Sequence, residues 1–185
     1  MRFLILSGNK KPEGLCLSVI QEIHRGASDG GAQASIMSLE GVGPCKNCND
    51  GWGLCKTEHD CAFGKDGFSE IHEAIKLADA LCVVLTSDSN KAAGVMTGFL
   101  DRLRNCESGQ FGQLANKPVL GISFPKKPDV TLLSGLEILD RFCRQTGAVI
   151  FDFLGVQSWN SDYARASAYA AGKVMAYGRK ADIIL

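Results

Sequence analysis

Residues 80–86, which read ALCVVLT, decide the fold class of this chain. A continuous apolar run of this kind is typical of a strand that is covered on both faces of a parallel sheet. Four further apolar runs predict four more strands, at residues 2–6, 34–39, 117–124 and 148–155. Apolar residues at helical spacing lie between and after these runs, and they predict helices near residues 15–25, 68–78, 95–104, 132–146 and 163–179.

Five strands that alternate with helices predict an α/β fold, a three-layer sandwich around a five-stranded parallel sheet. The expected strand order is the flavodoxin-like order 2-1-3-4-5. In open sheets of this kind, ligands bind at the carboxyl ends of the strands. The loops expected there span residues 7–14, 41–67, 86–94 and 124–129.

Length and charge limit the classes of protein that the chain can belong to. A length of 185 residues suits a single domain over residues 1–185. The 20 basic and 20 acidic residues balance, which argues against a nucleic-acid-binding protein and against a polybasic membrane-surface protein. No apolar run reaches the roughly 18 residues that cross a bilayer, and the start of the chain lacks a signal-peptide pattern. We therefore expect a cytoplasmic protein.

Four of the eight cysteines, Cys45, Cys48, Cys55 and Cys61, fall within 17 residues, in a cysteine-rich insertion at about 41–67. Their spacing is C-x2-C-x6-C-x5-C, and a C-x2-C pair can bring two thiolates onto one metal site. Four thiolates can hold a tetrahedral zinc ion or a [4Fe–4S] cluster. The single short C-x2-C pair favours the cluster, and unliganded cysteines on a loop are the third reading.

The other cysteines and the histidines have simpler interpretations. Cys82 and Cys143 fall at apolar positions and are expected in the core, and Cys106 has no ligand-like spacing. His59 is a candidate replacement ligand but is expected to be a solvated loop residue, and His72 is expected on the surface of its helix.

Three short motifs resemble those of a known family. The first is Ser7-Gly8-Asn9-Lys10-Lys11 after the first strand, where a turn that leads into a helix can bind a phosphate. The second is Phe99-Leu100-Asp101-Arg102, and the third is Lys117-Pro118-Val119. Together with the element order and the cysteine insertion, they resemble the NADPH-dependent FMN reductase-like flavoproteins and, within them, the iron–sulfur flavoproteins.

The resemblance implies a redox protein that binds FMN at the carboxyl ends of the strands and a [4Fe–4S] cluster at the four cysteines. It also implies NAD(P)H or a ferredoxin-like protein as the electron donor, and a homodimer or homotetramer. Because the cofactors carry such chemistry, no side chain is expected as a catalytic acid or base. The residues expected at the flavin are Ser7, Gly8, Asn9, Lys11, Cys16, Ser18, Ser87, Asp88, Ser89, Asn90, Phe124, Pro125 and Lys126.

An alternative hypothesis comes from the loops after the third and fourth strands. The loop at residues 86–91 lacks the proline and the aromatic residue of the family, and residues 124–129 lack its glycine-rich run. These differences are compatible with a relative that has no flavin. Such a protein would act as a metal-binding module with structural zinc, or as a partner-binding module.

Overall fold

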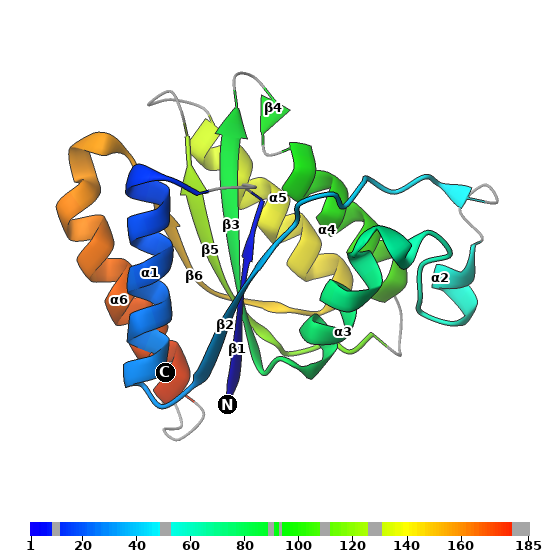
Figure 1. Ribbon diagram of the computed structural model, residues 1–185, viewed down its shortest axis with the longest axis horizontal. Helices are drawn as coiled ribbons and strands as arrows, with labels where there is room; N and C mark the ends of the chain where they lie inside the picture. The colour runs from blue at the N-terminus through cyan, green and yellow to red at the C-terminus, as the bar shows by residue number, and fades with distance from the viewer. Residues whose placement is uncertain are drawn as a thin grey trace.

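The computed structural model describes residues 1–8, 12–48, 53–88, 91–92, 94–107, 112–125 and 131–178. Its main sheet confirms the predicted fold, because five parallel strands follow the expected flavodoxin-like order, β2-β1-β3-β5-β6 (Figure 1). The strands are β1 (Arg2–Ser7), β2 (Gln33–Ser38), β3 (Ala80–Asp88), β5 (Pro118–Phe124) and β6 (Val149–Gly155).

Helices cover both faces of this sheet and make it the middle layer of three (Figure 1). One face is covered by α1 (Gly14–Asp29) and α6 (Ser161–Tyr177). The other is covered by α3 (Phe68–Leu77), α4 (Gly94–Glu107) and α5 (Thr131–Thr146). A short helix, α2 (Leu54–Thr57), lies inside the cysteine-rich segment.

Alternation along β1 shows why the sheet is buried on both sides. Phe3 and Ile5 point into the core beneath α1 and α6, whereas Leu4 and Leu6 point into the core beneath α3 and α4. Since successive side chains of a strand point to opposite faces, an uninterrupted apolar run is what a doubly covered strand requires. Cys82 of β3 and Cys143 of α5 are buried in these cores, as their apolar positions predict.

The structure contains one short strand that was not predicted from the sequence. β4 (Lys91–Ala92) pairs antiparallel with the end of β3, with Ser87 opposite Ala92 and Asp88 opposite Lys91. The third strand therefore continues beyond the apolar run into the polar residues Ser87 and Asp88. Backbone pairing with β4 accompanies this extension of the strand.

The expectation that His72 lies on the surface is wrong. Its side chain is fully buried, and its Nε2 atom lies 2.5 Å from Oε1 of Glu107 at the end of α4. His72 follows Phe68 by four residues and precedes Ile75 by three, so helical periodicity places it on the buried face of α3. Burial alone would raise the pKa of Glu107, but the hydrogen bond with His72 and the backbone donor of Gln113 lower it.

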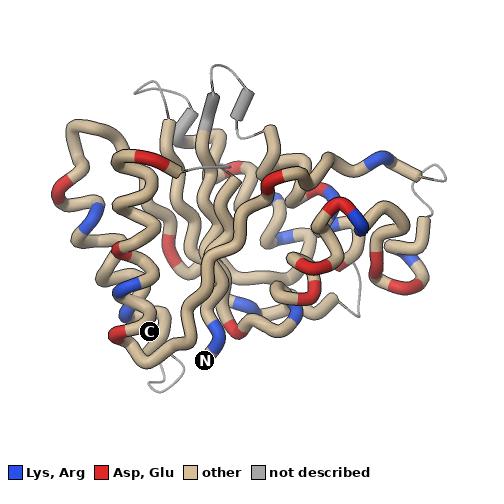
Figure 2. Tube along the Cα trace, in the orientation of Figure 1, with Lys and Arg blue, Asp and Glu red and all other residues tan. Residues whose placement is uncertain are grey.

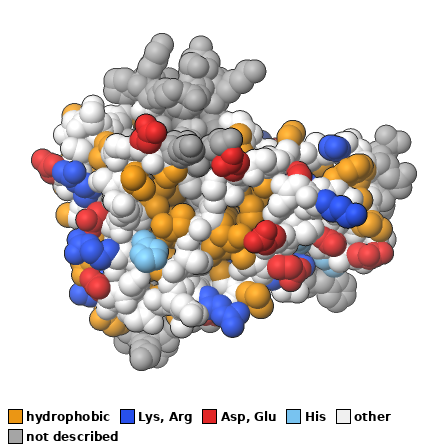
Figure 3. Space-filling view, viewed as in Figure 1, with side chains coloured by type: hydrophobic (Ala, Val, Ile, Leu, Met, Phe, Trp, Pro, Cys, Tyr) orange, Lys and Arg blue, Asp and Glu red, His pale blue; other side chains and the backbone are white. Residues whose placement is uncertain are grey.

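The surface carries basic and acidic residues side by side around the molecule (Figure 2). Apolar side chains show on the face that contains the sheet edge at β2, where Ile36 and Leu77 are exposed (Figure 3). Among the described helices, none combines the length and the apolar character that a membrane-spanning helix needs.

Candidate functional site: a five-cysteine pocket and a phosphate-type turn

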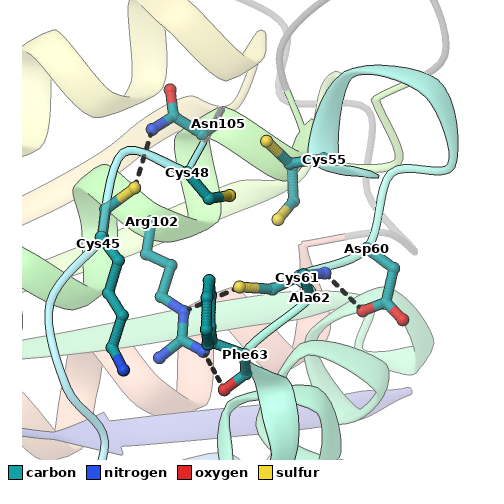
Figure 4. A pocket seen from close by; sticks show the side chains of 11 residues that line it. Cys45, Cys48, Cys55, Asp60, Cys61, Ala62, Phe63, Arg102 and Asn105 are labelled. Carbon is teal, nitrogen blue, oxygen red and sulfur yellow. Dashed lines mark hydrogen bonds between the residues drawn. The ribbon is translucent and has the colours of Figure 1, made fainter. Parts of the chain in front are cut away.

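The four clustered cysteines line one pocket beside α4 (Figure 4). Cys45 and Cys48 come from the segment that follows β2, Cys55 lies in α2, and Cys61 follows α2. They line a small cavity that is partly open to solvent. The pocket is lined by Cys45, Lys46, Cys48, Cys55, Asp60, Cys61, Ala62, Phe63, Arg102, Asn105 and Cys106.

Arg102 of α4 holds the ends of the cysteine-rich segment together. Its guanidinium is almost fully buried and donates from Nη1 to the carbonyl of Gly43, at 3.1 Å, and from Nη2 to that of Phe63, at 2.7 Å. A third donor, Nε, lies 3.2 Å from Sγ of Cys61 (Figure 4). The cation also lies 4.2 Å from the centre of the Phe68 ring. One side chain therefore anchors the segment before Cys45 and after Cys61.

Asp66 completes the set of acceptors around Arg102. Its Oδ2 atom accepts from Nη1 of Arg102 at 2.7 Å and from the backbone of Gly43 at 3.0 Å, while its Oδ1 atom accepts from the backbone of Phe68. Partial burial alone would raise the pKa of Asp66, but the hydrogen bonds from Arg102, Gly43 and Phe68 outweigh it and lower the pKa to about 2.

Two more residues of α4 reach the same pocket. Nδ2 of Asn105 lies 3.4 Å from Sγ of Cys45, and Cys106 also lines the cavity, while it belongs to the buried core beneath α3, α4 and α5. Arg102, Asn105 and Cys106 are spaced i, i+3 and i+4, so they share one face of the helix. Sequence analysis quoted Arg102 only within a motif and assigned no site role to Asn105 or Cys106.

Two glycines let the segment approach its neighbours closely. A Cβ atom on Gly53 would lie 2.5 Å from Sγ of Cys48, and one on Gly98 would lie 3.0 Å from Cβ of Pro44. Gly53 therefore makes room for a thiol at the start of α2, and Gly98 lets the segment lie against α4. A larger residue at position 53 would displace Cys48 from the pocket.

The thiols influence one another electrostatically. Burial and then the neighbouring Cys48 raise the pKa of Cys55, and burial followed by Cys61 and Cys55 raises the pKa of Cys106 to about 12. Among the described parts of the chain, no three His, Cys, Asp or Glu side chains are arranged to hold a single metal ion. The thiols of this pocket surround a volume instead of converging on one point.

A second candidate site lies where β1 leads into α1. Ser7 is buried at the end of the strand, and Gly8 donates its backbone N–H to Val84 at 3.4 Å. The N-terminus of α1 has no side-chain cap from Glu13 and no acidic residue in its first turn. Within the described residues, Oγ of Ser18 is buried without a hydrogen-bond partner. The start of a helix, with its backbone amides and positive dipole end, suits a phosphate, and the Ser18 hydroxyl could add a hydrogen bond.

The remaining residues predicted at the flavin divide into two groups. The first lies within the described chain: Cys16 is half-buried in α1, where burial raises its pKa to about 11, and Phe124 and Pro125 are half-buried at the end of β5. Ser87 and Asp88 form the β3–β4 hairpin through their backbones. The second group, Asn9, Lys11, Ser89, Asn90 and Lys126, lies outside the described residues.

Helix α4 connects the two sites. Cβ of Met96, in its first turns, lies 3.2 Å from the position that a Cβ atom would take on Gly8. Its last turns carry Arg102, Asn105 and Cys106 to the cysteine pocket. At 1.5 Å per residue, the ten residues from Met96 to Cys106 separate the two places by about 15 Å along the helix. The cysteine pocket thus lies beside α4, away from the phosphate-type turn.

The sequence profile described as NADPH-dependent FMN reductase matches residues 1–128. The chain belongs to this family. Membership makes the protein an NAD(P)H-dependent oxidoreductase that uses a flavin. No curated protein sequence matches the chain closely enough to count as a relative.

Solved structures of low sequence identity share the fold. A flavone reductase is 16% identical with a TM-score of 0.72, over 99% of this chain, which spans only 64% of that protein. An NAD(P)H:quinone oxidoreductase from Methanothermobacter marburgensis is 16% identical, with a TM-score of 0.65 over 94% of this chain and 95% of that one. A flavodoxin from the domain Archaea is 12% identical, with a TM-score of 0.61 over 98% of this chain and 100% of that one.

The lowered pKa of Asp66 gives a prediction about stability and pH. A carboxyl group whose pKa falls from 3.8 to about 2 on folding stabilises the folded state above pH 4, and this contribution disappears as the pH falls towards 2. We expect Asp66→Asn to lower the free energy of unfolding at pH 7 by about 1 kcal/mol, the scale of a partly exposed ion pair. Urea denaturation followed by circular dichroism at a series of pH values measures this difference.

The difference between the wild type and Asp66→Asn should shrink between pH 4 and pH 2. The matched control is Asp162→Asn, since Asp162 forms an ion pair with Arg165 on the exposed surface of α6. A difference for Asp66→Asn that stays constant down to pH 2 would contradict the assignment.

Proposed function

We propose that this protein is an FMN-dependent redox protein of the iron–sulfur flavoprotein kind, with a [4Fe–4S] cluster bound by Cys45, Cys48, Cys55 and Cys61. The observation that supports it is the pocket itself, in which four cysteines surround one cavity next to N–H donors from α4. The donor set fits the cluster, because a [4Fe–4S] cube is bound by four thiolates.

A cluster is better supported than a single zinc ion. Four thiolates around zinc lie about 3.8 Å from one another, because each Zn–S bond is about 2.3 Å long. Among the described residues, no three His, Cys, Asp or Glu side chains are arranged to hold one metal ion, whereas a cube takes one thiolate at each of four separate irons.

Charges and hydrogen bonds at the pocket also suit an anionic cluster. Arg102 and Lys46 line the cavity and bring positive charge to it. Nε of Arg102 donates to Cys61, while Nδ2 of Asn105 and the backbone N–H of Asn47 donate to Cys45. Hydrogen bonds to cluster sulfurs and nearby charge set the reduction potential of such a site.

The turn between β1 and α1 fits the phosphate of FMN. The open N-terminus of α1 offers backbone amides, and Oγ of Ser18 offers a hydroxyl that no described residue uses. Ser7 and Gly8 place the chain at the carboxyl end of β1, the edge where the open-sheet rule expects a ligand. These residues would hold the phosphate and so orient the flavin.

When bound, FMN supplies hydride acceptance and the cluster supplies one-electron transfer. The chain binds and orients the two groups and keeps them at opposite ends of α4. We propose NAD(P)H or a ferredoxin-like protein as the electron donor and a homodimer or homotetramer as the assembly, both supported by the family resemblance. A cytoplasmic location would keep the thiols reduced. In this proposal residues 1–185 form one domain, with residues 41–67 as its metal-binding insertion.

The proposal predicts the content of the purified protein. Protein purified without oxygen should show flavin absorbance and contain about four irons and four acid-labile sulfides per chain. NADPH should bleach the flavin band at about 450 nm if NADPH is the donor, and a reduced ferredoxin should do so otherwise. Metal analysis and absorbance spectroscopy measure these quantities. A colourless protein with one zinc per chain would contradict the proposal and support the flavin-free alternative.

The phosphate assignment predicts a loss of flavin affinity in Ser18→Ala. Removing one hydrogen bond to a charged phosphate should weaken FMN binding about tenfold, which corresponds to about 1.4 kcal/mol. Quenching of FMN fluorescence during titration measures the affinity. Ser28→Ala is the matched control, because Ser28 is exposed at the other end of the same helix. Equal affinities of the two variants would remove Ser18 from the site.

The Arg102 contact predicts a lower reduction potential in Arg102→Gln. A positive charge and an N–H donor at a cluster sulfur favour the more negative, reduced form, so their loss should lower the potential by about 60 mV, or about 1.4 kcal/mol for one electron. A redox titration followed by electron paramagnetic resonance (EPR) measures it. Arg102→Lys keeps the charge and should shift the potential less.

Arg104→Gln is the matched control for this potential. Arg104 lies on the same helix, but it donates to Gln145 and contacts Asp101. An equal shift in Arg104→Gln and Arg102→Gln would show that general charge, and not the contact with Cys61, sets the potential.

A further inference from the structure

A fifth cysteine lines the pocket in addition to the four that the spacing identified. Cys106 lies in the last turn of α4, is 1% exposed to solvent and borders the same cavity as Cys45, Cys48, Cys55 and Cys61. Sequence spacing gave no reason to include it, because it follows Cys61 by 45 residues (positions 61 and 106).

Helical geometry explains how Cys106 reaches the pocket. Arg102 and Cys106 are four residues apart and therefore lie one above the other on the same face of α4. Arg102 donates to Sγ of Cys61 at 3.2 Å. Asn105, the residue before Cys106, donates to Sγ of Cys45 at 3.4 Å. Contacts to two clustered thiols thus come from the helical turn that immediately precedes Cys106.

A second contact brings the segment before Cys61 onto Cys106. Nδ1 of His59 lies 2.7 Å from the backbone carbonyl oxygen of Cys106, which places residues 59–61 against the last turn of α4. Cys61 also accepts from Nε of Arg102, one helical turn before Cys106. Of the clustered cysteines, Cys61 is therefore the one whose position Cys106 is best placed to take.

The other cysteines outside the cluster have different surroundings. Cys82 lies in β3 under α1 and α6, and Cys143 lies in α5 within the opposite core. Neither lines the cysteine pocket, and neither does Cys16 of α1. Cys106 thus differs from Cys143, although both are buried thiols on helices of the same face of the sheet.

We propose that Cys106 is a reserve ligand of the metal site, which binds the iron otherwise held by Cys61 when Cys61 is absent or detached. The inference rests on the proposed cluster. A four-iron cube needs one thiolate for each iron, so five thiols around one cavity exceed the requirement by one. Sγ of Cys106 would then hold the iron in place of Sγ of Cys61. The proton of the Cys106 thiol would pass to the released Cys61 thiolate, or to solvent if Cys61 is missing, with no change of oxidation state.

Iron content in matched variants tests the proposal. Cys106→Ala should keep the wild-type iron content and EPR spectrum. Cys61→Ala should also keep about four irons per chain, with a changed EPR spectrum because one ligand comes from a new place. The double variant Cys61→Ala/Cys106→Ala should lose iron, to about three per chain or fewer. The control, Cys61→Ala/Cys143→Ala, removes a core cysteine instead and should behave like Cys61→Ala.

Each other result would overturn the proposal. Equal iron loss in Cys61→Ala and in the double variant with Cys106→Ala would show that Cys106 cannot replace Cys61. Iron loss in Cys106→Ala alone would make Cys106 an obligatory ligand. Circular dichroism and FMN binding of every variant check that the α/β core is folded. If the wild type itself contains no iron, the proposed function fails, and that outcome is distinct from failure of the reserve ligand.

Discussion

Burial of the Arg102 guanidinium is the constraint on which the arrangement of the cysteine-rich segment depends. A buried cation is costly unless its donors are paired, and the penalty for an unpaired one is about 3–5 kcal/mol. The partners of Arg102 lie at Gly43, Cys61, Phe63 and Asp66, on both sides of the clustered cysteines. The cysteine-rich segment must therefore contact α4 at both of its ends before all the donors of Arg102 are paired. Pairing of this charge brings the thiols together.

The same constraint separates the two candidate sites. The phosphate-type turn belongs to the α/β core, and its free amides follow from the way β1 leads into α1. The thiol pocket is built by a segment whose described residues form mainly the short helix α2 and a 3-10 turn, and its contacts with α4 position the cysteines. One site is a property of the fold, and the other is added to the fold through α4.

The sequence predicted the core of the molecule much better than the pocket, and the reason is the range of the interactions. A parallel strand that is buried on both faces consists of a continuous apolar run, so residues 80–86 are recognised as such a strand from the sequence alone. Helical periodicity also predicts the buried position of His72, because His72 lies on the same face of α3 as Phe68 and Ile75.

The pocket depends on contacts between distant parts of the chain. The contact of Arg102 with Cys61 spans 41 positions and that of Asn105 with Cys45 spans 60. No local pattern reports such pairs, so Cys106 could be recognised only after α4 was placed. Similarly, β4 forms from backbone pairing in a polar stretch and leaves no periodic signal.

Helix α4 fixes two quantities: the distance between the two candidate sites, and the angle around the helix axis between its residues at one site and its residues at the other. Each added or deleted residue turns the rest of a helix by about 100°. One extra residue between Met96 and Arg102 would leave the contact of Met96 with Gly8 intact and rotate Arg102, Asn105 and Cys106 away from the cysteines. Substitutions on the exposed side of α4 carry no such consequence. The geometry of the two sites therefore fixes the length of α4 between Met96 and Arg102 more strictly than it fixes the residues on the exposed side of this helix.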